Sequence, residues 1–201
     1  MAAAFAPPLV FTVLVAVAGG IAVAELWLLR RSAIAAATEL VLLAIGITAL
    51  VYLRALGDHG AAHPIAAGFA VWLLLAIGAT WAADVGAYAI GSVWGRRKIA
   101  PRISPGKTWE GTFGGFGAAA LAVLGIAALF GLGRPEAAAA ALTIGPVAFA
   151  GDLIESWLKR GAGVKDSGTL FPGHGGMLDR IDSLIAVAPL VAGLTLAAGL
   201  G

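Results

Sequence analysis

The stretch GTFGGFGAAALAVLGIAALFGLG, residues 111–133, contains no charged side chain and decides how the rest of the chain is interpreted. A helix that crosses a bilayer needs about 20 mostly apolar residues, and this stretch is long enough. Backbone N–H and C=O groups find no water in the hydrocarbon core, so the segment must satisfy them internally as a helix. The sequence therefore predicts an all-α integral membrane protein.

Five further segments are also long and mostly apolar. Of the 201 residues, 60% are hydrophobic and only 12% are charged, which is a membrane composition. There is no cysteine, which excludes disulfides and thiolate chemistry. We expect a single transmembrane domain over residues 1–201 with about six spanning helices, at 5–29, 33–53, 64–88, 111–133, 137–157 and 183–201.

Basic residues are concentrated on one side of this predicted bundle. Of the 13 Lys and Arg residues, all but Arg54 and Arg134 lie in the segments that follow the first, third and fifth spans. By the positive-inside rule, this side faces the cytoplasm. The two long polar segments, 91–111 and 156–183, are therefore expected to meet at the cytoplasmic surface and to form the site.

Several carboxylates lie inside the predicted spans. An ionisable residue there is costly unless it faces a partner, an ion or a water-filled cavity. Asp84, Asp152 and Glu155 lie near the cytoplasmic ends of their spans, which makes them candidates for a functional site. The alternative is that they reach the membrane surface or pair with a nearby arginine. Glu25 and Glu39 are expected to be structural, because no other polar residue clusters with them in the sequence.

The first polar segment contains SPGKTWEG, residues 104–111. Pro105 and Gly106 predict a turn that displays Lys107 beside Ser104, as a contact for a phosphate. The GxxxxGK[ST] pattern is absent and no strand is predicted before it, so a Walker-type NTPase is not expected. The basic residues earlier in the segment are equally consistent with attachment to an anionic membrane surface.

The second polar segment combines three kinds of residue that bind phosphate and metal. Basic side chains neutralise phosphates, glycines let backbone N–H groups approach an anion, and carboxylates are hard ligands for Mg²⁺. They are the basic residues Lys159, Arg160, Lys165 and Arg180, the glycines Gly173, Gly175 and Gly176, and the acidic residues Asp166, Asp179 and Asp182. Asp179 and Asp182 are three residues apart, so on a helix they project from one face. This combination predicts a site for a nucleotide phosphate chelated to a divalent cation.

These residues also follow a recognisable pattern, S-x-x-K-R, then K-D, then P-x-H-G-G-x-x-D-R-x-D. It resembles the signature of phosphatidate cytidylyltransferases, also called CDP-diacylglycerol synthases. The matching positions are Ser156, Lys159, Arg160, Lys165, Asp166, Gly168, Phe171, Pro172, His174, Gly175, Gly176, Asp179, Arg180 and Asp182. DVGAY from Asp84 and SPGKTWEG from Ser104 are also similar to that family, so the resemblance covers roughly residues 65–200. Members of the family are usually longer, with additional spans at the N-terminus.

The resemblance implies an activity and its partners. Enzymes of this family condense CTP with phosphatidate to give CDP-diacylglycerol and pyrophosphate, using magnesium, and a homodimer is typical of them. We therefore expect a Mg²⁺-dependent nucleotidyltransferase of phospholipid biosynthesis in the bacterial inner membrane, with no nucleic-acid partner and with its site facing the cytoplasm. A requirement for a second, monovalent cation is left open.

The residue chemistry and the resemblance together suggest a division of roles. Residues 65–201 would form the catalytic region, and residues 1–64 the N-terminal helices. The expected metal ligands are Asp152 and Asp179, with Asp84 in support. Catalytic roles are expected for Asp152, Asp179, Asp182, Lys165 and Asp166. Substrate contacts are expected from Ser104, Lys107, Ser156, Lys159, Arg160, His174, Gly175, Gly176 and Arg180. Whether His174 binds phosphate or transfers a proton is open.

Two alternatives remain at this stage. One is a CTP-dependent enzyme that acts on another lipid phosphate or on a polyprenol. The other is a membrane transporter of an anionic substrate, because carboxylates inside spans and interrupted helices also mark ion pathways.

Overall fold

The computed structural model describes residues 7–28, 33–63, 69–170 and 175–200. Within these residues the chain forms six long helices: α1 (Pro8–Leu28), α2 (Ala33–Leu56), α3 (Val71–Trp94), α4 (Trp109–Phe130), α5 (Arg134–Gly161) and α6 (Leu178–Ala197). Each is long and apolar enough to cross a membrane. The prediction of a polytopic, all-α membrane protein with six spans is confirmed. Helix α5 extends further than expected, beyond Lys159, and α6 begins earlier, before Asp179.

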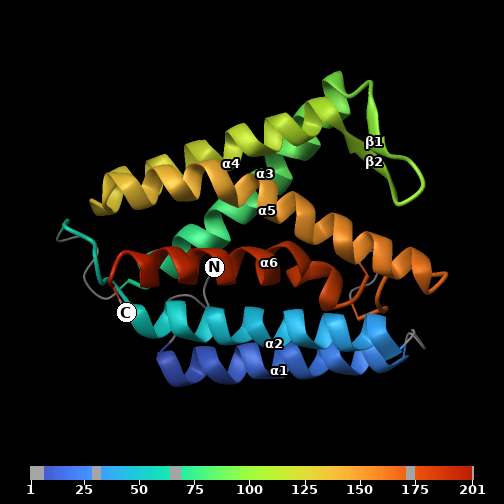
Figure 1. Ribbon diagram of the computed structural model, residues 1–201, viewed down its shortest axis with the longest axis horizontal. Coiled ribbons are helices and arrows are strands. Elements are labelled where there is room, and N and C mark those ends of the chain that lie inside the picture. The colour runs from blue at the N-terminus through green and yellow to red at the C-terminus, as the bar shows by residue number, and fades with distance from the viewer. Residues whose placement is uncertain (1–6, 29–32, 64–68, 171–174, 201) are drawn as a thin grey trace.

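The helices pack in an order that differs from their order along the chain. Helices α1 and α2 lie side by side along one edge of the molecule, and α6 lies between α2 and α5 (Figure 1). Helix α4 packs on both α3 and α5. Trp72, Ile144 and Val187 are fully buried in the core, whereas Leu121 and Leu142 are largely exposed on the outer surface. Exposed apolar side chains on spanning helices are suited to contact with lipid.

Small residues bring α3 and α4 into close contact. A Cβ atom added to Gly115 would lie 2.7 Å from the carbonyl oxygen of Ala83, and one added to Gly111 would lie 2.7 Å from that of Ala87. Glycines that allow such approach are typical of helix pairs in membranes. The GTFGGFG stretch thus permits close backbone contact, which places Asp84 of α3 beside the N-terminal half of α4.

A short β-hairpin lies between α3 and α4. Strands β1 (Lys98–Ala100) and β2 (Ser104–Thr108) pair antiparallel. The prediction of a turn at Pro105 and Gly106 was wrong: both lie in β2, and the turn is at residues 101–103. Proline is compatible with a strand that has a free edge, as both strands of a two-stranded sheet do.

The hairpin is attached to the start of α4 by one side chain. Glu110 Oε2 accepts hydrogen bonds from the backbone N–H groups of Arg96 and Arg97, at 3.1 and 3.2 Å. Thr108 caps α4, because its side-chain oxygen accepts the N–H of Gly111 at 3.2 Å. These contacts fix strand β2, and with it Lys107, relative to the helices.

Candidate active site

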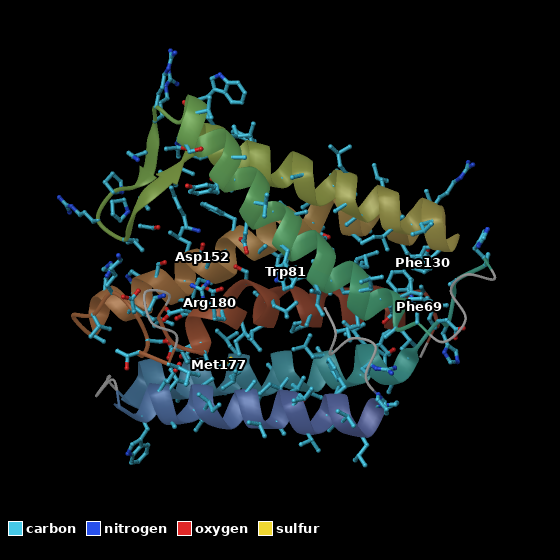
Figure 2. The ribbon with its side chains drawn as sticks, turned by 180° about the vertical axis from the view of Figure 1, so that it is seen from behind. Phe69, Trp81, Phe130, Asp152, Met177 and Arg180 are labelled. Atoms are coloured by element: carbon cyan, nitrogen blue, oxygen red, sulfur yellow. The ribbon has the colours of Figure 1, made fainter. Side chains whose placement is uncertain are left out.

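A cavity of about 550 Å³ opens at the hairpin end of the bundle. It is lined by α3, β2, α4, α5, the segment after α5, and α6. Figure 2 shows Asp152, Arg180 and Met177 at this end, while Phe69 and Phe130 lie at the opposite end. Nine residues singled out in the sequence line this cavity: Asp84, Ser104, Lys107, Asp152, Lys159, Asp166, Asp179, Arg180 and Asp182. The two polar segments therefore meet, as the charge distribution predicted.

Strand β2 presents Lys107 to helix α5. The Lys107 ammonium group forms an ion pair with Asp152 Oδ2 and lies 4.8 Å from the centre of the Phe149 ring, which places a cation over an aromatic face. Ser156, one turn further along α5, donates a hydrogen bond to Asp152 Oδ1 at 3.2 Å. Asp152 is thus held from both sides, yet 34% of its side chain stays exposed toward the cavity.

A second, more deeply buried ion pair joins α5 to α6. Lys159 Nζ lies 2.5 Å from Asp179 Oδ1 and 3.3 Å from Glu155 Oε1, and all three side chains are less than 10% exposed. The remaining oxygen of Asp179, Oδ2, accepts three hydrogen bonds: from Ser167 N at 2.8 Å, Ser167 Oγ at 2.9 Å and Gly176 N at 2.7 Å. Asp179 therefore fastens the segment between α5 and α6 to the start of α6.

Two glycines of the signature, Gly175 and Gly176, lie against the Asp179 carboxylate. Gly175 has φ +82°, in the left-handed region, and a Cβ atom there would lie 2.4 Å from Asp179 Oδ2. Glycine adopts such a φ without the steric cost that other residues incur. In the structure the N–H of Gly176 donates to Asp179, so the predicted contact of these glycines with substrate remains a prediction.

The carboxylates of the cavity come from three helices and one connecting segment. Asp84 lies on α3, Asp152 on α5, and Asp179 and Asp182 on α6, while Asp166 follows α5. The prediction that Asp179 and Asp182 share one face of a helix is confirmed, since both line the cavity. Among the described residues, no three Asp, Glu or His side chains converge closely enough to hold a metal ion by themselves. The metal role of Asp84, Asp152 and Asp179 remains a prediction.

Other predicted site residues are not part of the described lining of the cavity. Arg160 donates from Nε to the carbonyl of Ile103 at 3.0 Å and from Nη1 to that of Val164 at 2.8 Å, so it ties the hairpin turn to the end of α5. Lys165 is exposed and does not belong to the described lining of the cavity. His174 lies outside the described residues, as do Phe171, Pro172 and Gly173. Their roles remain predictions.

Sequence reasoning missed three contributors to this site, Phe149, Ser167 and Glu25, and did not identify the ion-pair partner of a fourth, Glu155. Phe149 reads as an ordinary apolar residue of a span, and Ser167 as an ordinary loop residue, so neither gave a signal. Glu155 was a candidate only because it is charged within a span, and its partner Lys159 lies one helical turn away. Glu25 was interpreted as structural, but its carboxylate reaches the start of α6, 153 residues later in the chain.

The sequence also matches known proteins. Residues 60–197 match the model of the cytidylyltransferase family. A phosphatidate cytidylyltransferase of Pseudomonas aeruginosa is 45% identical over 156 residues, which cover 69% of this chain and 51% of that protein. One of Synechocystis sp. is 48% identical over 122 residues, which cover 59% and 41%. The uncharacterized protein YnbB of Escherichia coli is 48% identical over 124 residues, which cover 61% and 42%.

The chain spans about half the length, or less, of these relatives. The matched region nevertheless includes the hairpin, α3 to α6 and every predicted site residue. Because the family model covers well over half of the chain, and the cavity lies wholly within the match, the chain belongs to the cytidylyltransferase family.

Proposed function

We propose that the chain transfers the cytidylyl group of CTP to phosphatidate, giving CDP-diacylglycerol and pyrophosphate. The observation that carries this proposal is the cavity, where lysine and arginine side chains alternate with carboxylates at one end of six apolar helices. This is the chemistry that a charged nucleotide and the headgroup of a bilayer lipid require together. Relatives at 45–48% identity carry the name phosphatidate cytidylyltransferase, which supports the assignment.

The reaction joins two phosphates. A phosphate oxygen of phosphatidate attacks the α-phosphorus of CTP, the new P–O bond forms, and the bond between the α-phosphorus and its bridging oxygen to the β-phosphate breaks. Pyrophosphate leaves with the electron pair. Transfer of this kind depends on positioning and charge neutralisation more than on a covalent nucleophile.

The chain's cations are positioned for that task before substrate arrives. Lys107 and Lys159 are held in the cavity by Asp152 and Asp179, and Arg180 also lines it. An ammonium group has three N–H donors, so each lysine can keep its carboxylate partner and still donate to phosphate oxygens. We propose that Lys107 contacts the triphosphate, because it lies at the more open of the two ion pairs.

The cavity's charge favours a divalent cation as cofactor. Among the residues that the structure describes, five carboxylates and three basic side chains line it, which gives these residues a formal charge of −2 before any anionic substrate enters. Mg²⁺ is usually bound by one or two carboxylates together with substrate phosphates, so a closed cluster of three is not required. When bound, it would reduce the negative charge of the triphosphate.

Among the candidate ligands, Asp152 and Asp84 suit this role better than Asp179. Asp152 keeps a third of its side chain exposed, whereas the Asp179 side chain is buried and its Oδ2 already accepts three hydrogen bonds. For Asp179 to bind the cation, it would first have to give up Lys159 or one of its backbone donors. A monovalent second cation has no separate support among the described residues and is left open.

The orientation and assembly follow the same reasoning. We propose that the cavity faces the cytoplasm of a bacterial inner membrane, because most basic residues lie at its end of the bundle. The family resemblance further implies a homodimer, and crosslinking in native membranes tests it.

Purified protein in detergent, labelled CTP, Mg²⁺ and a panel of lipid phosphates test the proposed reaction. We expect CDP-lipid and an equal amount of pyrophosphate, formed only when phosphatidate is present. Preference for an isoprenoid lipid phosphate would reassign the substrate. Absence of CTP consumption, combined with anion uptake into sealed vesicles, would instead favour a transporter.

A further inference from the structure

Glu25 of α1 occupies the N-terminal end of α6. Its side chain is buried, and its carboxylate accepts the backbone N–H of Met177 at 2.9 Å through Oε1 and that of Leu178 at 3.0 Å through Oε2. The first N–H groups of a helix have no partner within the helix. A carboxylate from a distant helix therefore supplies acceptors that α6 lacks, and its charge also suits the positive end of the helix dipole.

The same carboxylate connects to Asp179 through one serine. Ser167 Oγ lies 3.1 Å from Glu25 Oε2 and 2.9 Å from Asp179 Oδ2. A hydroxyl group has one proton, which here lies between two carboxylates. Ser167 also donates its backbone N–H to Asp179 Oδ2 at 2.8 Å. The position of Asp179 in the cavity thus depends on a side chain that approaches from outside the cavity.

Two glycines make room for Glu25. A Cβ atom at Gly176 would lie 2.4 Å from Glu25 Oε2, and one at Gly168 would lie 2.8 Å from Glu25 Oε1. At distances under 3.0 Å, the added Cβ atom and its neighbour cannot both stay in place. At these two positions glycine is needed because a carboxylate from α1 fills the space that a side chain would take.

We propose that Glu25 is a positioning residue for the active site, and that it acts through Ser167 and Gly176 on the carboxylate of Asp179. Glu25 precedes the region matched by the family model, which begins at residue 60. Helix α1 then contributes to the geometry of the site and also spans the membrane. The effect on catalysis rests on the proposed function, whereas the effect on the geometry of the loop does not.

The geometric part is tested by hydrogen–deuterium exchange on the full chain in detergent. Glu25→Gln keeps the size of the side chain but turns an N–H₂ group toward a backbone donor. We expect the amides of residues 176–178 to exchange at least about tenfold faster, since each 1.4 kcal/mol lost in protection is a factor of ten. Glu39→Gln is the matched control, because Glu39 is an equally buried carboxyl group on α2, and the N–H groups of Met177 and Leu178 donate to Glu25 instead. Unchanged exchange in Glu25→Gln and in Glu25→Ala overturns the proposal, whatever reaction the protein catalyses.

The catalytic part is tested with CTP and phosphatidate as substrates. Glu25→Gln and Ser167→Ala should each lower kcat by about 10- to 100-fold, the usual effect of removing a hydrogen-bond partner that orients a residue of the site. The double variant should be no worse than the poorer single variant, because the two residues act in one chain of hydrogen bonds. Independent, multiplying effects would show that Glu25 does not act through Ser167 and would overturn this part of the proposal. If the wild type forms no CDP-lipid, the proposed function fails and the exchange experiment still decides the role of Glu25.

Discussion

Lys159 shows how closely charge is balanced in this membrane protein. Its ammonium group lies between Glu155 and Asp179, and none of the three side chains is open to solvent. Removing one partner of a buried ion pair usually costs more than the pair contributes, because the other charge is left uncompensated. Here two carboxylates contact Lys159, so its charge keeps one partner when the other is removed.

Asp179→Asn is expected to insert and fold but to lose turnover. Lys159 keeps Glu155 as a partner, so its charge stays compensated, whereas the amide cannot accept from Ser167, Gly176 and Lys159 together. We expect kcat to fall by about 100-fold or more, with a thermal midpoint only slightly lowered. The measurement is CTP- and Mg²⁺-dependent CDP-lipid formation in detergent, with unfolding followed on the same samples. Near-normal turnover would remove Asp179 from the site.

Lys107→Met is expected to remove one phosphate contact. The apolar chain still packs on Phe149, but the charge next to Asp152 is lost. Loss of a single preorganised electrostatic group typically lowers kcat by about 10²- to 10³-fold. Lys98→Met is the control, since Lys98 is an exposed lysine of the same hairpin, outside the cavity. Equal effects of the two changes would indicate that the hairpin contributes only its general charge.

At the scale of elements, the spans and the site differ in what a sequence can reveal. The apolarity of a span is a local property, so all six helices were predicted. The pairing of Lys98 with Thr108 and of Ala100 with Ser104 depends on partners across the hairpin, and the turn-forming residues Pro105 and Gly106 pointed elsewhere. Contacts between distant segments were out of reach: Glu25 and Ser167 are 142 residues apart.

The close contact of α3 and α4 gives a test at this scale. Gly115→Ala places a methyl group 2.7 Å from the carbonyl oxygen of Ala83, one residue before Asp84. We expect a loss of about 1–3 kcal/mol of stability from overpacking, together with reduced activity as Asp84 shifts. Gly117→Ala in the same helix is the control, because a Cβ atom there meets nothing within 4 Å. The thermal midpoint of the two variants in detergent decides, and equal midpoints would contradict the tight packing.

At the scale of the whole molecule, the two ends of the bundle differ in polarity. The cavity, the hairpin and most basic residues lie at one end, and Phe69 packs on Phe130 at the other, with ring centres 5.7 Å apart. The lack of cysteine allows single labels to report this asymmetry. If the cavity binds CTP as proposed, the charged end of the bundle must face the cytoplasm.

Arg102→Cys and Arg134→Cys should label from opposite sides of the membrane. Both residues are exposed, one in the hairpin turn and one at the start of α5. With a thiol reagent that cannot cross the bilayer, we expect Arg102→Cys to react in inside-out vesicles and Arg134→Cys in right-side-out vesicles. The reverse pattern would place the cavity outside the cell, and labelling of both in one preparation would contradict a membrane crossing by α4.

The contact of Glu25 with the start of α6 also has a consequence for the order of biosynthesis. Helix α1 is made well before its partners, since Ser167 follows Glu25 by 142 residues and Leu178 by 153. At about 5–20 residues per second, this is a delay of roughly 7–30 s. During that interval Glu25 is in or near the bilayer without the N–H groups that later satisfy it. Arrival of α6 from the ribosome supplies these N–H groups and brings Asp179 to the cavity, so both events occur together and late in synthesis.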